Sequence, residues 1–165
     1  MPLPAPPSLA RRASLALVAL WPMLRPATAA AQDGGLVTLP SAHAVRPTLD
    51  RFATAVRQEG WVVFGEVDHA AAARQAGLTL PARTVVLFGN PRAGTGAMAQ
   101  QPTLALDLPM RVLVWEDAAG RVFVTRSTGA DIARRVFARH GITVPPDQQA
   151  MTEALLDRLV RQAAG

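Results

Sequence analysis

The chain between Pro47 and Gly60 carries apolar residues at helical spacing. They recur three and four positions apart, so they form one stripe, and the charged residues Asp50 and Arg57 lie outside it. Pro47 suits the first turn of a helix, and Gly60 is a typical left-handed C-terminal stop. This segment is therefore predicted to be an amphipathic helix with one face on a core.

Five other runs are rich in β-branched and aromatic residues and predict strands. They are Gly35–Leu39, Trp61–Val67, Thr84–Phe88, Val112–Glu116 and Val122–Thr125. The run Thr84–Phe88 is apolar at every position after the first, which is typical of a strand covered on both faces. The segment Asp117–Gly120 separates the last two runs and predicts a hairpin turn.

Three further helices are indicated by caps, stops and apolar spacing. Asp68 is placed to cap a short helix over His69–Ala76, which Gly77 ends. Thr128 and Asp131 have capping-box spacing ahead of a second helix. A final amphipathic helix is predicted over residues 147–163, and its residues expected to face inward are Met151, Leu155, Leu156 and Leu159.

The order of these elements predicts a fold class. Strand, helix, strand, helix, strand and a long loop are followed by two strands and two helices. Five strands with helices that can lie over one face predict a two-layer α+β domain. The final helix follows a break at Pro145-Pro146, so two placements stay open for it, on the sheet or on a second subunit.

The first 31 residues predict a secretory signal peptide. Arg11 and Arg12 precede an apolar stretch over Ala13–Leu24, and small residues follow before a cleavage site after Ala29 or Ala31. This apolar stretch is too short to cross a bilayer of about 30 Å. We therefore expect an exported protein, periplasmic or secreted, whose mature part is a single domain over residues 32–165 without a membrane span.

Composition removes several classes of function. The chain has no cysteine, which excludes disulfides, thiolate nucleophiles, iron–sulfur clusters and cysteine zinc sites. All 17 basic residues are arginine, and their scatter along the chain offers no clustered basic face for nucleic acid. Three of them, Arg11, Arg12 and Arg25, leave with the signal peptide.

A series of short motifs resembles the DUF302 family, a bacterial domain of unknown function. The segments that carry the resemblance are Asp68-His69, Ala73, Gly77-Leu78, Leu80-Pro81, Phe88-Gly89-Asn90-Pro91, Gly94-Thr95, Met98, Asp107-Leu108-Pro109, Val112–Trp115, Glu116-Asp117 and Gly120. The resemblance implies a curved, largely antiparallel sheet and a homodimer, and it implies no established activity. Arg126 departs from the family's usual aromatic residue, so a pocket at that position would differ in this protein.

Two residues are candidate ligands for a metal ion or a haem. His69 begins a predicted helix, where an imidazole can bind metal or accept a proton. Met98 lies in the predicted glycine-containing loop, where a thioether can bind copper(I) or haem iron. The alternatives are that His69 packs on the neighbouring strand and that Met98 fills a gap in the core. Sequence alone identifies no cofactor.

A second group of residues is expected to line a small-ligand pocket. Asn90 and the loop residues Gly94 and Thr95 follow a strand end, and Glu116 ends another strand. Asn90 has an equally good structural role, because Asn tolerates turn geometry.

Three functions stay open from sequence. The leading hypothesis is an exported, non-enzymatic module that binds a small ligand or a partner in the cell envelope. The second is a metal- or haem-binding redox accessory or enzyme that uses His69 and Met98. The third is a structural dimerisation module whose interface is the final helix.

Overall fold

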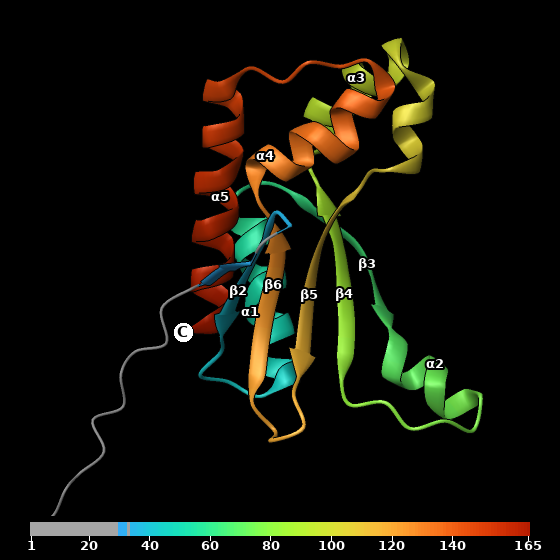
Figure 1. Cartoon of the computed structure of the whole chain (residues 1–165), viewed down its shortest axis with the longest axis vertical. Helices are drawn as coiled ribbons and strands as arrows, with labels where there is room; N and C mark the ends of the chain where they lie inside the picture. Colours follow the sequence, from blue (N-terminus) through green and yellow to red (C-terminus); the bar gives the residue numbers. More distant parts are fainter. Residues whose placement is uncertain (1–29, 33) are drawn as a thin grey trace, which may run out of the picture.

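Six antiparallel strands form one curved sheet in the computed structural model, which describes residues 30–32 and 34–165 (Figure 1). Their order across the sheet is β1-β2-β6-β5-β4-β3. The strands are β1 (Ala30–Gln32), β2 (Leu36–Pro40), β3 (Val62–Asp68), β4 (Arg83–Gly89), β5 (Met110–Glu116) and β6 (Val122–Ser127). The five strands expected from sequence are β2 to β6, which confirms the α+β class and the antiparallel sheet.

Strand β1 was not expected, because it lies at the end of the predicted signal peptide. It pairs with β2, with Ala31 opposite Val37. Cleavage after Ala31 would leave the five-stranded sheet β2 to β6. The rest of the predicted leader lies outside the described residues.

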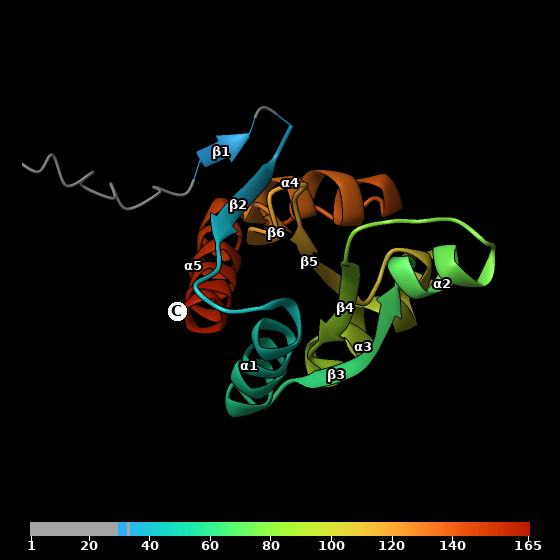
Figure 2. The ribbon, with the colours of Figure 1, turned by 90° about the horizontal axis from the view of Figure 1, so that it is seen from below.

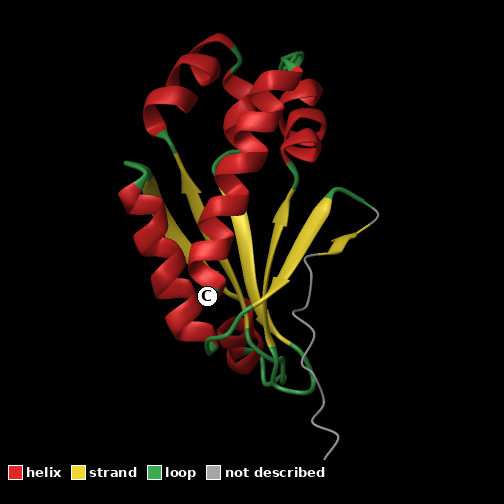
Figure 3. Cartoon of the chain, turned by 90° about the vertical axis from the view of Figure 1, so that its left-hand side faces the viewer, coloured by secondary structure: helices red, strands yellow, loops and turns green. Residues whose placement is uncertain are grey.

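Two long helices, α1 and α5, lie side by side on one face of the sheet (Figures 2 and 3). Shorter helices sit at the ends of the strands. The α-helices are α1 (Val45–Gln58), α2 (His69–Gln75), α3 (Pro91–Gln100), α4 (Gly129–Ile132) and α5 (Pro146–Ala164). A 3₁₀ helix η1 (Pro102–Leu106) follows α3, and a π-helical turn η2 (Ala133–Phe137) and a 3₁₀ turn η3 (Ala138–His140) extend α4.

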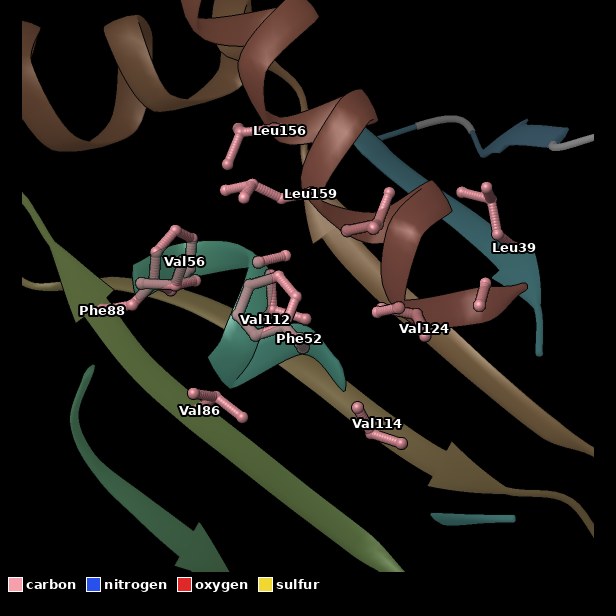
Figure 4. Packing of buried hydrophobic residues seen from close by; sticks show 14 of the residues in the cluster. Leu39, Phe52, Val56, Val86, Phe88, Val112, Val114, Val124, Leu156 and Leu159 are labelled. Atoms are coloured by element: carbon pink, nitrogen blue, oxygen red, sulfur yellow. The ribbon is translucent and has the colours of Figure 1, made fainter. Parts of the chain in front are cut away.

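The core lies between this helix layer and alternate residues of the strands (Figure 4). On β4, Val86 and Phe88 are fully buried, and the ring of Phe88 meets that of Phe52 on α1 edge to face, with centroids 5.1 Å apart. Helix α5 contributes Leu156 and Leu159, which are 1% and 0% exposed. This burial supplies most of the favourable free energy of folding.

The predicted helix caps are confirmed. The Asp68 carboxylate accepts a hydrogen bond from the Ala71 N–H at 2.9 Å, so it begins α2. The Thr128 hydroxyl accepts one from the Asp131 N–H at 3.1 Å, so it begins α4. Helix α1 ends before Gly60, whose φ of +72° favours glycine.

The segment expected to be a loop is the helix α3. The Asn90 side chain accepts hydrogen bonds from the Arg92 and Ala93 N–H groups at 3.0 and 3.4 Å, and Pro91 occupies the first turn. An N-cap and an N-terminal proline favour a helix strongly enough to offset the low helix propensity of Gly94 and Gly96. The loop prediction for this segment was therefore wrong.

The final helix packs on the sheet of its own chain, which resolves the two placements left open by the sequence. Its buried residues lie among the β-strand side chains of the core. Met151 was expected to face inward, but it is 71% exposed. Apolar spacing places Met151 on the same stripe as Leu155, yet the first turns of α5 extend beyond the core.

We expect the change Leu159→Ala to destabilise the protein by about 2 to 5 kcal/mol, because it leaves a cavity in a fully buried site. Urea unfolding of the purified domain measures this loss. The matched control on the same helix is Met151→Ala, which should change the free energy of unfolding by less than about 0.5 kcal/mol. Equal losses in the two variants would contradict the placement of α5.

Candidate functional site

The residues proposed as a site from sequence lie at two opposite ends of the sheet. His69 begins α2, which follows the end of β3. In the strand register, Asp68 at the end of β3 lies opposite Thr84 at the start of β4. Asn90 follows the far end of β4, about 20 Å from Thr84 at the rise of a strand. Figure 1 shows α2 and α3 at opposite ends of the molecule. One chain therefore does not bring His69 and Met98 to the same ion.

The residues of the α3 end have contacts that stabilise the fold. Asn90 caps the helix, and the Thr95 hydroxyl donates a hydrogen bond to the Pro91 carbonyl at 2.7 Å. A Cβ atom built on Gly94 would lie 3.6 Å from Met98 Cε, so Met98 packs over that glycine. This contact agrees with the gap-filling role of methionine.

Glu116 lies at the His69 end of the sheet, in the last position of β5. Its N–H donates a hydrogen bond to the Ala82 carbonyl at 3.0 Å, and its own carbonyl accepts one from Arg83 at 2.8 Å. The main chain of Glu116 therefore joins β5 to the segment that leads into β4.

No group of three or more His, Cys, Asp or Glu side chains that could hold a metal ion occurs among residues 30–32 and 34–165. His69 is exposed on α2. Over the same residues, no helix is both long and apolar enough to span a bilayer.

Arg126 is buried under the helix layer. It is 3% exposed and donates a hydrogen bond to Glu153 on α5 at 2.7 Å, with Asp157 3.6 Å away. Burial raises the pKa of Glu153, but hydrogen bonds from Arg126 and from the Gly129 N–H outweigh it and hold that pKa below its ordinary value. Arg126 thus forms an ion pair between β6 and α5, and its Nε is buried without a hydrogen-bond partner among the described residues.

A polar cluster that the sequence did not predict joins η1 to η3. His140 Nε2 lies 2.6 Å from Asp107 Oδ2, and His140 Nδ1 lies 2.9 Å from the Thr103 hydroxyl. Arg139 donates a second hydrogen bond to Asp107 at 3.2 Å. The hydrogen bond from His140 is the main cause of the lowered pKa of Asp107, and the charges of Arg139, His140 and Arg111 add to it.

The side of the sheet opposite α1 and α5 carries side chains that are mostly apolar. We call this surface the open face, and it is formed by Val62, Phe64 and Val67 of β3, Arg83, Val85 and Leu87 of β4, Arg111, Leu113 and Trp115 of β5, and Phe123 and Thr125 of β6. In the structure of residues 30–32 and 34–165, no helix covers it (Figure 3).

The exposure of the open face is unusual for an antiparallel sheet. Such sheets usually alternate apolar residues toward the core with polar residues toward water. Here Phe64, Val67 and Val62 are 55%, 42% and 40% exposed, while Val85 and Leu87 are half-buried. The unbroken apolar run of β4 predicted a strand covered on both faces. In this structure, helices of the same chain cover only one face of β4.

Aromatic side chains of the open face near the β5–β6 turn are held in place by their neighbours. Trp115 stacks on Phe123 with ring centroids 4.7 Å apart, and its Nε1–H donates a hydrogen bond to Thr125 at 2.9 Å. The guanidinium groups of Arg83 and Arg121 lie over Trp115 and Phe123, each 5.6 Å from the ring centroid. These contacts order the face before any partner binds, which lowers the entropic cost of binding.

A two-layer α+β domain with one helix-covered and one open sheet face defines the class of this protein. Residues 37–160 match the model of the family described as "Domain of unknown function DUF302". The chain therefore belongs to the DUF302 family, as the motif order indicated.

A solved structure with the same fold is the uncharacterized conserved protein DUF302 from Bacillus stearothermophilus. The TM-score is 0.64 at 14% sequence identity, over 79% of this chain and 98% of that chain. This likeness concerns the fold.

Curated relatives from Brucella are longer proteins. The chain is 44% identical over 110 residues to a protein named "Fluoride-specific ion channel FluC 1" from Brucella suis biovar 1 (strain 1330), over 67% of this chain and 43% of that protein. A protein of the same name from Brucella abortus biovar 1 (strain 9-941) matches at 44% identity, over 41% of its length. The chain thus spans less than half the length of these relatives.

We expect the change Asp107→Asn to lower the melting temperature at pH 7. A carboxyl group with a lowered pKa in the folded state stabilises that state above the ordinary pKa of about 3.9. Its contribution is lost as the pH falls through the folded-state pKa. The difference between wild type and variant should therefore shrink at pH 3, as thermal unfolding monitored by circular dichroism measures. The control Asp147→Asn, at an exposed position of α5, should show no such difference.

Proposed function

We propose that the protein is an exported, non-enzymatic binding domain of the cell envelope, and that the open face is its protein interface. The occupant that we propose is a second copy of this chain. One observation carries the proposal. Both faces of the sheet carry mostly apolar side chains, but α1 and α5 cover only one of them.

The dimensions of the open face support this occupant. Four strands about 4.8 Å apart, six or seven residues long, span a flat area of roughly 19 by 23 Å. This flat area is about half of the ~800 Å² of accessible surface that each partner contributes to a standard protein interface, and the relief of the side chains adds to the flat area. Apolar residues, among them Val85 and Leu113, fill its centre, and aromatic residues flank them, which is the composition of an interface core.

Charge placement sets limits on the way two copies meet. Arg121 is paired with Asp117, and the Arg83 guanidinium donates hydrogen bonds to the Ala82 and Glu116 carbonyls. Within the described residues no carboxylate pairs with Arg83, so it brings a positive charge to the open face. Arg111 is exposed near the start of β5, two residues from Leu113 on the same face of the strand. Two copies related by a twofold axis displaced from Leu113 toward Trp115 would keep Arg111 nearer the polar rim of the interface.

Sequence supports the remaining parts of the proposal. Export rests on the predicted signal peptide, and the homodimer agrees with the resemblance to the DUF302 family. The proposal assigns no reaction and no cofactor. A ligand site that includes both His69 and Met98 would need two chains, because the two residues are at opposite ends of the sheet in one chain.

A second candidate is favoured by the Brucella relatives. In these proteins, the matching segment belongs to a longer chain named as a fluoride-specific ion channel. The open face would then dock this domain on a membrane channel protein. Both candidates use the same surface, and they differ in the oligomeric state of the purified domain.

We expect the mature protein to be a dimer and the variant Leu113→Glu to be a monomer. A carboxylate at this half-buried position would lose its hydration at a closed interface, and that cost is several kcal/mol. Size-exclusion chromatography with light scattering measures the mass, and a melting curve of the variant tests that the fold is retained.

The matched control is Ala154→Glu, which adds the same charge on the exposed side of α5 and should leave the dimer intact. A wild-type protein that is monomeric at high micromolar concentration would reject the homodimer and favour the channel partner. A dimer that persists in Leu113→Glu would place the interface elsewhere.

A further inference from the structure

A pocket lies on the side of the sheet away from the open face, between α1, β3, α2 and the start of β4. Its volume is about 280 Å³, close to the lower limit of roughly 300 Å³ for small-molecule sites. Figure 2 shows β3 leading from α1 to α2. The size suits a ligand with few non-hydrogen atoms.

The floor of the pocket is apolar, and one buried polar group opens into it. The apolar lining residues are Val45, Leu49, Ala70, Leu80 and Ala82. Thr84 is 5% exposed and also lines the pocket. Its hydroxyl makes no hydrogen bond with any other residue that the structure describes. A buried hydroxyl at the floor of a pocket favours a ligand with a hydrogen-bonding group.

One pair of charges in the wall is already satisfied. The Arg46 guanidinium binds both oxygens of Glu66 at 2.8 and 3.0 Å and also Asp50 at 2.7 Å. Hydrogen bonds with Glu66, and then with Asp50, raise the pKa of Arg46 above its ordinary value. Arg46 and Glu66 therefore form a fixed wall and leave little charge for a ligand.

A second pair of charges remains available. Asp68 uses one oxygen, Oδ1, to cap α2. Arg74 stands near the other end of α2 and, in the described part of the chain, no carboxylate pairs with it. The pocket thus presents one free carboxylate oxygen and one free guanidinium above an apolar floor.

These features select a ligand class. An anion would satisfy Arg74 and leave Asp68 unpaired, and a cation would do the opposite. A zwitterion satisfies both. We propose that this pocket binds a free amino acid with an aliphatic side chain, with its ammonium at Asp68, its carboxylate at Arg74 and its side chain over Leu49 and Leu80. The hydroxyl of Thr84 hydrogen-bonds the ligand from below.

The first test uses L-leucine as the probe and isothermal titration calorimetry of the mature protein as the measurement. Saturable binding of one molecule per chain is expected. Isocaproate lacks the ammonium group and isoamylamine lacks the carboxylate, so each should bind at least about tenfold more weakly. Binding of either analogue as tightly as leucine would overturn the zwitterion assignment, and no heat with leucine, valine or isoleucine at millimolar concentration would overturn the site.

The second test uses variants that keep the fold. Arg74→Gln changes an exposed side chain and should weaken leucine binding roughly tenfold or more. The matched control is Arg57→Gln, an exposed arginine of α1 outside the pocket, which should bind like wild type. Thr84→Val keeps the shape of the buried side chain and should also weaken binding. Equal affinities in Arg74→Gln and Arg57→Gln would overturn the proposal.

Because the pocket and the open face lie on opposite sides of β4, Leu113→Glu should bind leucine normally whether or not the homodimer exists.

Discussion

The contact between the rings of Phe88 and Phe52 holds the sheet to the helix layer, and much of the remaining structure depends on it. Phe88 lies near the end of β4, beside the edge strand β3, and Trp61 also stacks on its ring, with centroids 6.3 Å apart. This packing determines which side of β4 faces α1. Since side chains alternate along a strand, it also determines that Val85 and Leu87 face away from the helices.

The same alternation separates the two proposed surfaces. Thr84 points toward the helix side, where the pocket lies, and Val85 points to the open face. A partner on the open face would leave the pocket accessible from the other side of the sheet. A small ligand and a protein partner are therefore compatible with one fold, and binding of one does not sterically exclude the other.

Arginine serves several distinct roles in this lysine-free chain. Arg126 joins β6 to α5 from a buried position, Arg46 forms one wall of the pocket, and Arg83 lies on a tryptophan ring. The planar guanidinium suits each role, because it can bind a carboxylate with two donors or stack on an aromatic face. On the open face, the guanidinium groups of Arg83 and Arg121 stack on Trp115 and Phe123, so these charged side chains lie against aromatic rings.

Sequence alone determined the elements whose signals are local. The strands β2 to β6, the caps at Asp68 and Thr128 and the stop at Gly60 were predictable, because they depend on residues within one turn or one strand. The family followed from the order of short motifs. Helix α3 was missed although its cap and proline are local, because its glycines suggested a loop.

Only the tertiary structure decided which distant residues meet. The ion pair of Arg126 with Glu153 and the contact of His140 with Asp107 join residues 27 and 33 positions apart. The separation of His69 from Met98 and the gathering of Leu49, Asp68 and Thr84 around one pocket depend on strand register and helix packing. The spacing of residues along the chain does not predict these contacts, because they form only when the apolar faces of the helices pack on the sheet.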